Sequence, residues 1–452
     1  MRIIAAILLV ATLPGFSRAE APVFEMSFSR CRTDALASSD RIRATERDLE
    51  ATRQRAGSQG GLMWPKLAVE GSYRYLDQIA ELTPFPGRPP IALGAHDNYS
   101  VGPTVNWVVW DWGALYSGWK GAWARSDAKR EELALVRRQV LFGATLTYAQ
   151  VQLALETVNQ LADAAKLADD QYADISLRRK TGSASRIDEL QAHQDSLTRR
   201  RQYAQARAEL GAGLLDLFAQ TGVGGTDAPP AVLAAGGGQG LDASVPFLQV
   251  KLDRLEDTLS ALEPVSQGDP DPAYPGVAMN ERLADSARRA SWSATAQRLP
   301  RITVTGKTSL DYPNGPVLEQ IHQNMVGVAA VMPLFEGGRI VREANDAKEQ
   351  AKGFDERRDL ARIELDRDWK KAAGRLTALR EQKLLNATAV KETAELAGLT
   401  YDSYKSGQAR FIEVQAANLR ALDAKVQDAR TKTEMIVQLA IMQSLAKEGD
   451  KP

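Results

Sequence analysis

A long run of sequence without a helix breaker is the feature that most constrains what this chain can fold into. From Gly113 to Gly182 there is no proline, and between positions 133 and 175 apolar or small residues recur at an average spacing of 3.5 residues. That spacing is typical of a coiled-coil seam. A helix over 113–181 rises about 1.5 Å per residue, which makes a rod of roughly 100 Å. An ordinary globular domain does not need such a rod.

The chain contains this design twice. The interval from Gly338 to Gly407 is also free of proline and has the same length. Just before the two intervals, residues 101–113 (VGPTVNWVVWDWG) align with residues 326–338 (VGVAAVMPLFEGG) at a constant offset of 225 and without a gap. The second long helix is therefore predicted over 338–406, and the equal lengths predict that both helices reach the same plane.

Four stretches ahead of the long helices are predicted to be β-strands, in two pairs. Apolar and polar residues alternate with a period of two, clearly in LAVEGSYRY (67–75) and less clearly in MVGVAAVMPLF (325–335). Each pair is joined by a long loop rich in Pro, Gly and Asn, so we expect two β-hairpins. The strands are placed at about 65–78, 97–110, 300–311 and 323–335.

The strand pattern alone fits a soluble, half-buried sheet as well as a sheet that spans a membrane. A cluster of tryptophans where the second strand ends favours the membrane, because spanning barrels place aromatic residues at the interface. The cluster comprises Trp107, Trp110, Trp112, Trp119 and Trp123. After Leu13 no run of 18 apolar residues occurs, so we expect no helical membrane span in the mature chain.

Each long helix is predicted to end in a tight turn. Basic residues precede Gly182, where cations suit the helix dipole and glycine suits a left-handed cap. Ser185 and Asp188 then form a capping-box pattern, and Gly407 marks the equivalent turn in the second copy. The returning helices are placed at 186–219 and 409–447. Shorter helices at about 28–58 and 278–298 precede the two hairpins and are predicted to stack end to end on the returning helices.

Composition and the N-terminus narrow the class of protein. Arg2 and the apolar run Ile3 to Leu13 precede a small-residue site at Ala19, which predicts a signal peptide over 1–19. Lys plus Arg and Asp plus Glu number 57 each, so no net field favours nucleic acid. The single cysteine, Cys31, has no internal partner for a disulfide and is interpreted as structural.

These features together resemble the TolC-like outer-membrane efflux and secretion channels. The resemblance covers the mature chain and consists of the signal peptide, the duplicated order of helix, hairpin, long helix and returning helix, the LFEGGR junction at 334–339 and the YKSG tip at 404–407. The first copy departs from it, with Trp-Asp-Trp-Gly at 110–113 and Arg179 where the second copy has Tyr404.

The resemblance implies a mixed α+β membrane protein made of two tandem repeats. The repeats would occupy 20–218 and 278–447, with an equatorial linker at 219–277 and a tail at 448–452. Three chains would form a homotrimer, a shared twelve-stranded outer-membrane β-barrel and a periplasmic α-helical barrel. Such a protein is a passive exit duct of a tripartite efflux pump or type I secretion system in a Gram-negative bacterium. Its partners are a periplasmic adaptor, an inner-membrane transporter and outer-membrane lipid.

The resemblance also assigns roles to particular residues. The strand–helix junctions would be Asp111, Gly113, Glu336, Gly337 and Gly338. The adaptor-docking tips would be Thr181, Gly182, Ser183, Ser406, Gly407 and Gln408. Asp188 and Glu413 would line the narrow periplasmic mouth as a ring of carboxylates, with Arg186 and Arg410 as the nearest cations.

Catalytic interpretations find little support. The three histidines, His96, His193 and His322, have no metal-ligand spacing, and two of them are placed in hairpin loops. The GGGQG segment is not followed by Gly-Lys-Ser/Thr, so it is interpreted as linker, next to an amphipathic helix expected over 246–264. We therefore expect no enzyme, cofactor or metal. A periplasmic coiled-coil adaptor is the alternative function, a simple porin is less compatible with the long helices, and the cargo stays open.

Overall fold

The computed structural model describes residues 24–83, 87, 91–222 and 250–447. The predicted signal peptide, much of the linker and the tail lie outside the described residues. The chain divides into two compact units, each built from three separate segments. One unit contains Gly143–Pro264 and Leu376–Ala440, and the other contains Ser39–Phe142, Val265–Arg375 and the end of the chain. Two helices of 67 residues, α3 (Ala114–Lys180) and α8 (Arg339–Lys405), contribute to both units.

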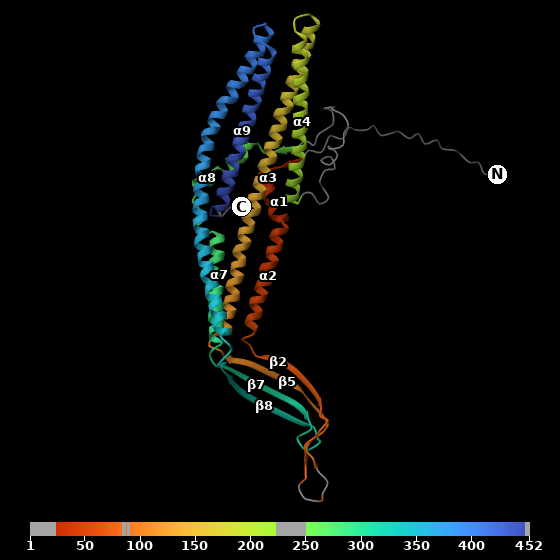
Figure 1. Cartoon of the computed structure of the whole chain (residues 1–452), viewed down its shortest axis with the longest axis vertical. Helices are drawn as coiled ribbons and strands as arrows, with labels where there is room; N and C mark the ends of the chain where they lie inside the picture. The colour runs from red at the N-terminus through yellow and green to blue at the C-terminus, as the bar shows by residue number, and fades with distance from the viewer. Residues whose placement is uncertain (1–23, 84–86, 88–90, 223–249, 448–452) are drawn as a thin grey trace, which may run out of the picture. The chain divides into compact units, whose positions relative to one another are not determined.

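The second unit carries a four-stranded antiparallel sheet (Figure 1). Its strands are β2 (Lys66–Tyr75), β5 (Asp97–Trp110), β7 (Arg301–Tyr312) and β8 (Ile321–Val331), in the order β2-β5-β7-β8. Pairing of β5 with β7 joins the two hairpins into one sheet. Among the described residues, the outer edges of β2 and β8 have no partner strand.

The strands differ from the sequence expectation at their ends. β8 ends at Val331 rather than at 335, because Pro333 has no N–H for a ladder hydrogen bond. It begins at Ile321, which pairs with Asp311, so His322 lies in the strand and not in a loop. The loop between β2 and β5 contains a small hairpin that the sequence analysis missed, β3 (Glu81–Leu82) with β4 (Ile91–Ala92).

Four helical segments of the second unit end where the sheet begins (Figure 1). They are α2 (Asp40–Gly61), α7 (Pro275–Ala296) and the adjoining parts of α3 and α8. α7 begins with a proline in its first turn, a position where the missing N–H costs nothing. Glycine at 121 favours the close approach of α3 and α7, since a Cβ there would lie 3.2 Å from the Ser286 carbonyl oxygen, tighter than an ordinary contact.

A buried ion pair fixes the end of the last helix in the same unit. Arg138 of α3 donates a 2.6 Å bond to Asp271, and both side chains are less than a tenth exposed. The Asp271 N–H in turn donates to the Leu445 carbonyl oxygen at 2.9 Å, at the end of α9 (Phe411–Leu445). The Tyr274 ring lies 5.5 Å from the guanidinium and completes the cluster. Removing one partner would leave an uncompensated buried charge, which is strongly destabilising.

The first unit contains the returning helix α4 (Arg186–Thr221), much of α9 and a helix α1 (Phe28–Ser38). The single helix expected over 28–58 is two helices, because Ser39 takes an extended conformation and caps α2 through the Ile42 N–H. Cys31 is fully buried, in agreement with its interpretation as structural.

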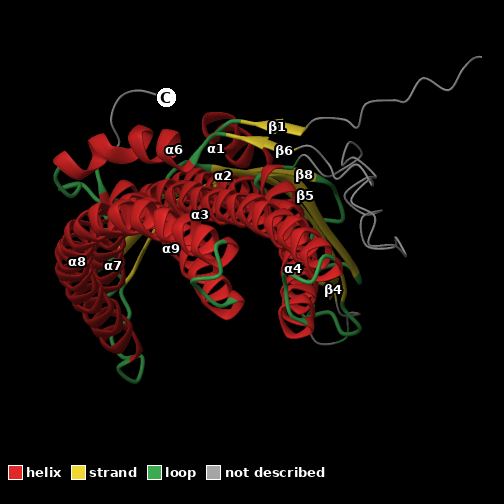
Figure 2. Cartoon of the chain, turned by 90° about the horizontal axis from the view of Figure 1, so that it is seen from above, coloured by secondary structure: helices red, strands yellow, loops and turns green. Residues whose placement is uncertain are grey.

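The first unit also contains a two-stranded parallel sheet that the sequence analysis missed. β1 (Phe24–Met26) pairs with β6 (Val250–Leu252), and Figure 2 shows the two strands side by side. The Tyr148 hydroxyl donates to the Met26 carbonyl oxygen at 2.9 Å and accepts from the Asp253 N–H at 3.1 Å. The amphipathic helix expected over 246–264 is therefore wrong at its start: strand pairing takes Val250–Leu252, and the helix α6 covers only Leu255–Leu262, followed by the 3-10 turn η1 (Glu263–Gln267).

Candidate docking and gating site at the helical tips

The two helical hairpins turn with the same backbone geometry. Gly182 and Gly407 both have a positive φ, +80° and +76°. The Gly182 N–H donates to the Arg179 carbonyl oxygen at 3.0 Å and the Ser183 N–H donates to that of Arg178 at 2.8 Å. The second tip repeats both bonds at Gly407 and Gln408, at 3.0 and 2.9 Å. This is the Schellman motif, in which glycine avoids the cost of a left-handed conformation. Equivalent tips present the same backbone shape twice per chain.

The first tip continues into a capping box. The Ser185 hydroxyl accepts from the Asp188 N–H at 3.0 Å, and the Asp188 carboxylate accepts from the Ser185 N–H at 3.3 Å. The Asp188 side chain therefore stabilises the N-terminus of α4, independently of any role in the predicted gate. The second tip has no equivalent box among its described residues; α9 begins at Phe411, and the Glu413 N–H donates to the Arg410 carbonyl oxygen.

Below the tips, the two hairpins share a small apolar core. Ile175 and Ala192 of the first hairpin pack with Phe411 and Val414 of the second, and all four are at most 1 % exposed. Partly buried residues surround this core: Tyr172, Ala184, Tyr401 and Tyr404. A core of this size is small compared with that of a domain, so polar contacts beside it contribute much of what holds the two helical hairpins together.

A polar link joins the same two hairpins. The Tyr401 hydroxyl of α8 donates to the Asp174 carboxylate of α3 at 2.9 Å. Arg178, one turn along α3, donates from Nε to the same carboxylate oxygen at 3.0 Å, and its Nη1 lies 3.5 Å from the Lys405 carbonyl oxygen. Sequence analysis missed Asp174 and Tyr401, because partners 227 residues apart leave no local signal.

Tyr401 of this link and the nearby Tyr404 both have a raised pKa. Burial, together with the hydrogen bond to Asp174, raises the pKa of Tyr401 to about 12. Burial also raises the pKa of Tyr404, and the negative charge of Asp188 raises it further. The charge of Asp188 in the first helical hairpin thus acts on a side chain of the second.

Within a single chain, some of the predicted gate residues form ion pairs and others do not. Arg186 pairs with Glu189 at 3.6 Å, and Arg179 contacts the same carboxylate. Sequence analysis missed Glu189, although its spacing of three from Arg186 was a usable signal. Arg410 and Glu413 are exposed, and neither has an ion pair among the described residues. At the first tip, the carboxylate that pairs with Arg179 and Arg186 is thus Glu189, whereas Asp188 forms the capping box.

The glycines at the strand–helix junctions adopt left-handed backbone conformations. Gly113, Gly337 and Gly338 have φ of +77°, +61° and +81°, and Trp112 shares the left-handed region at +57°. Asp111 accepts from the Gly113 N–H at 3.1 Å and from the Leu115 N–H at 2.7 Å, so it caps the start of α3. At the second junction Glu336 contacts Arg339.

The sheet has one apolar and one polar face. Leu67, Val105, Gly306 and Val326 are register partners across the four strands and share the apolar face. The next line across, Ala68, Thr104, Lys307 and Met325, belongs to the other face, where Glu70, Asn106, Thr305 and Ser309 also lie. Apolar side chains stay uncovered: Leu67, Val69 and Val326 are 73, 76 and 82 % exposed.

Aromatic residues mark both ends of this sheet. Trp110 and Trp112 are exposed beside the helices, whereas Tyr99 and Tyr312 stack at 5.2 Å near the other end. Trp110 lies eleven positions after Tyr99 along β5. At about 3.3 Å per residue and a strand tilt of about 40°, this part of β5 spans roughly 28 Å along the axis of a barrel. That distance is close to the height of the apolar band of an outer-membrane barrel.

Two negative findings concern the described residues only. No group of three or more His, Cys, Asp or Glu side chains there could hold a metal ion. No helix in the same part of the chain is long and apolar enough to cross a membrane.

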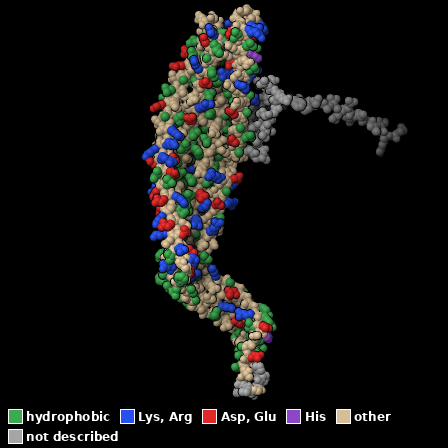
Figure 3. Space-filling view, viewed as in Figure 1, with side chains coloured by type: hydrophobic (Ala, Val, Ile, Leu, Met, Phe, Trp, Pro, Cys, Tyr) green, Lys and Arg blue, Asp and Glu red, His purple; other side chains and the backbone are tan. Residues whose placement is uncertain are grey.

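The surface of the helices carries charges of both signs, which are interspersed over the face shown in Figure 3.

Comparison with known proteins assigns the family. The sequence matches the family model of outer membrane efflux proteins over residues 32–223 and 276–446, well over half of the chain. The chain therefore belongs to the outer membrane efflux protein family, and its place is the outer membrane. No curated protein matches the chain.

Solved structures show the same fold at low identity. The outer membrane protein VceC from Vibrio cholerae is 15 % identical, with a TM-score of 0.72 over 92 % of this chain and 95 % of that one. The CmeC outer membrane channel of Campylobacter jejuni is 15 % identical, with a TM-score of 0.73 over 100 % and 95 %. A membrane protein from Pseudomonas aeruginosa is 16 % identical, with a TM-score of 0.73 over 96 % and 99 %.

Proposed function

We propose that this chain is the outer-membrane exit duct of a tripartite efflux pump or type I secretion system. The duct is passive; an inner-membrane transporter supplies the energy, and a periplasmic adaptor connects the two. The observation that carries the proposal is the exposed apolar face of the sheet, backed by a polar face. A soluble protein would cover such a face with helices, whereas a barrel turns it toward lipid and leaves the polar face to a water-filled lumen. The family match favours this duct over an adaptor.

The open edges of the sheet support a homotrimer. Backbone groups without partners cost several kcal/mol each in lipid, so four strands with two free edges do not suffice there. Pairing of β8 in one copy with β2 in the next gives a closed barrel of twelve strands for three copies. The long helices of the three copies then form the periplasmic tunnel.

The tips are the proposed contact with the adaptor and the proposed gate. Thr181, Gly182 and Ser183 at one turn and Ser406, Gly407 and Gln408 at the other offer two equivalent docking shapes per chain. In a trimer, Asp188 and Glu413 contribute six carboxylates around the mouth, with Arg186 and Arg410 beside them. The link between Tyr401 and Asp174 holds the two hairpins of each chain together when the mouth is closed.

The assembly is tested by measuring mass and conductance on the purified protein. We expect a trimer in detergent by light scattering and channels in planar bilayers. A stable monodisperse monomer that inserts into bilayers would contradict the trimeric duct.

The docking role is tested by replacing the tip glycines. Gly182→Val combined with Gly407→Val imposes a side chain on a left-handed backbone, which costs about 1–2 kcal/mol per site. We expect loss of cross-linking to the adaptor and loss of efflux, with the trimer still in the membrane. Gly398→Val is the matched control, because Gly398 lies inside α8 without a positive φ, and an added Cβ would meet nothing within 4 Å. Unimpaired efflux in the double variant would count against docking at the tips.

A further inference from the structure

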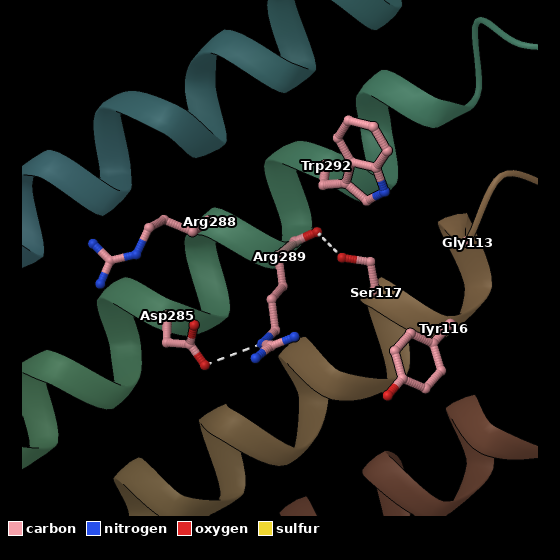
Figure 4. A pocket seen from close by; sticks show the side chains of 7 residues that line it. All are labelled: Gly113, Tyr116, Ser117, Asp285, Arg288, Arg289 and Trp292. Carbon is pink, nitrogen blue, oxygen red and sulfur yellow. Dashed lines mark hydrogen bonds and ion pairs between the residues drawn. The ribbon is translucent and has the colours of Figure 1, made fainter.

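A small open pocket lies between α3 and α7, beside the junction of strand and helix. Its volume is about 470 Å³, within the range of small-ligand sites, and it opens widely to solvent. Tyr116 and Ser117 border it from the first turns of α3, and Asp285, Arg289 and Trp292 border it from α7 (Figure 4). All of these residues belong to the sheet-bearing unit.

The walls of the pocket are held in place by hydrogen bonds between the two helices. The Ser117 hydroxyl donates to the Arg289 carbonyl oxygen at 2.8 Å, and the Ser293 hydroxyl donates to the Ala114 carbonyl oxygen at 2.9 Å. The pocket is therefore formed before any ligand arrives, which lowers the cost of binding.

The pocket presents a cation and an anion side by side. Arg289 donates from Nε to the Asp285 carboxylate at 3.0 Å, which uses one of its five N–H donors, and its side chain lies across the space between the helices (Figure 4). Arg288 also borders the pocket, but its guanidinium points away and pairs with Asp355 of α8 at 2.9 Å. Opposite charges at the pocket suit a ligand that carries both.

Two exposed aromatic residues flank these charges. Tyr116 is 52 % and Trp292 is 51 % exposed. Neither the Tyr116 hydroxyl nor the Trp292 indole N–H has a hydrogen-bond partner among the described residues. Side chains with an apolar body and a free polar tip are typical of the level where lipid head groups meet acyl chains. The exposed Trp110 and Trp112 lie at the same junction, next to the apolar face of the sheet.

We propose that this pocket binds the head group of a zwitterionic glycerophospholipid with a primary ammonium group. The N–H groups of Arg289 that have no partner among the described residues bind the phosphate, and the Asp285 carboxylate accepts from the ammonium. Tyr116 and Trp292 flank the glycerol region, and the acyl chains follow the apolar face of the sheet. The inference rests on the proposed function, which puts this junction at the inner surface of the outer membrane.

The test is native mass spectrometry of the intact trimer in detergent, titrated with short-chain phosphatidylethanolamine, phosphatidylcholine and phosphatidylglycerol. We expect the ethanolamine lipid to bind at least five-fold more tightly than the choline lipid, whose quaternary ammonium donates no hydrogen bond. Arg289→Gln should weaken binding at least ten-fold. Arg288→Gln removes the same charge from the neighbouring position and should change binding less than two-fold. Asp285→Asn should remove the preference for ethanolamine over choline and keep phosphate binding.

The proposal would be overturned by equal losses in Arg288→Gln and Arg289→Gln, by no difference between the ethanolamine and choline lipids, or by no binding because a second copy covers the pocket. A preference for phosphatidylglycerol over both would also overturn it. Bilayer conductance of the same preparations reports on the duct alone. The titration adds the lipids in solution and does not measure conductance. Loss of lipid binding at the pocket and loss of channel function can therefore be told apart.

Discussion

The Tyr401 hydroxyl donates a hydrogen bond to the Asp174 carboxylate across 2.9 Å, from one helical hairpin to the other. Arg178, which lies on α3 together with Asp174, contacts the same oxygen. The link stands beside an apolar core of only four fully buried residues. It is thus a polar contact whose loss the neighbouring packing does little to compensate.

The first prediction concerns this hydrogen bond. Tyr401→Phe keeps the ring and removes the donor, at a cost of about 1 kcal/mol to the closed tip. That corresponds to a roughly five-fold shift toward the open state. We expect a higher open probability in single-channel recordings of the trimer. Tyr404→Phe is the control, because the Tyr404 hydroxyl has no hydrogen bond among the described residues. Equal effects of the two substitutions would remove the link from the gate.

The second prediction concerns alkaline pH. Tyr401 has a pKa of about 12 in the folded protein, above the value of about 10 for an unperturbed tyrosine. Because the folded state binds this proton more tightly, the stabilisation is complete below about pH 10 and is lost as the pH rises through about 12. The difference in absorbance at 295 nm between wild type and Tyr401→Phe should show this titration. Asp174→Asn should lower the pKa, because the carboxylate charge raises it; an unchanged pKa would contradict the contact.

The third prediction concerns the ring of charges at the mouth. Arg186→Glu with Arg410→Glu adds repulsion between like charges, so we expect a looser closed state and higher single-channel conductance. Asp188→Asn with Glu413→Gln should remove block by multivalent cations added on the periplasmic side. Glu189→Gln is an informative companion, since Glu189 is the carboxylate that Arg186 contacts. If conductance and cation block match wild type in both double variants, Asp188, Glu413, Arg186 and Arg410 do not form the gate.

The fourth prediction concerns close packing within the sheet. A Cβ on Gly102 of β5 would lie 2.7 Å from the Ser309 Cα of β7, closer than backbone atoms tolerate. Gly102→Ala should therefore destabilise the sheet by about 1–3 kcal/mol. Gly306→Ala in β7 meets nothing within 4 Å and should be nearly neutral. The temperature at which the trimer dissociates on heating in detergent should fall for Gly102→Ala only; a similar fall in both variants would contradict this packing.

Local patterns in the sequence predicted the local features of the fold. Glycine after a run of cations predicted the left-handed turn at Gly182, and the spacing of Ser185 and Asp188 predicted the capping box, because both signals lie within a few residues. The period-two alternation predicted four strands for the same reason. Their ends were less accurate, since Pro333 stops β8 before the apolar pattern stops.

Contacts between distant segments were not predictable in this way. The parallel pairing of β1 with β6 joins two three-residue strands more than 220 residues apart, and strands that short carry no periodicity. The same applies to the Tyr401–Asp174 link and to the pocket of Arg289, whose helices become neighbours only in the folded chain. The sequence thus predicted where the tips are, and the structure added which side chains meet there.

The ion pair of Arg138 with Asp271 also has a consequence for biogenesis. Through Asp271 it ties Leu445, at the very end of α9, to the middle of the chain. A polypeptide that is still being exported lacks this last helical turn and so exposes an unfinished sheet-bearing unit, drawn from three distant segments. Contacts of such long range form slowly. Completion of the sheet-bearing unit therefore waits for the C-terminal end of α9, and a chain truncated before Leu445 would lack this tie.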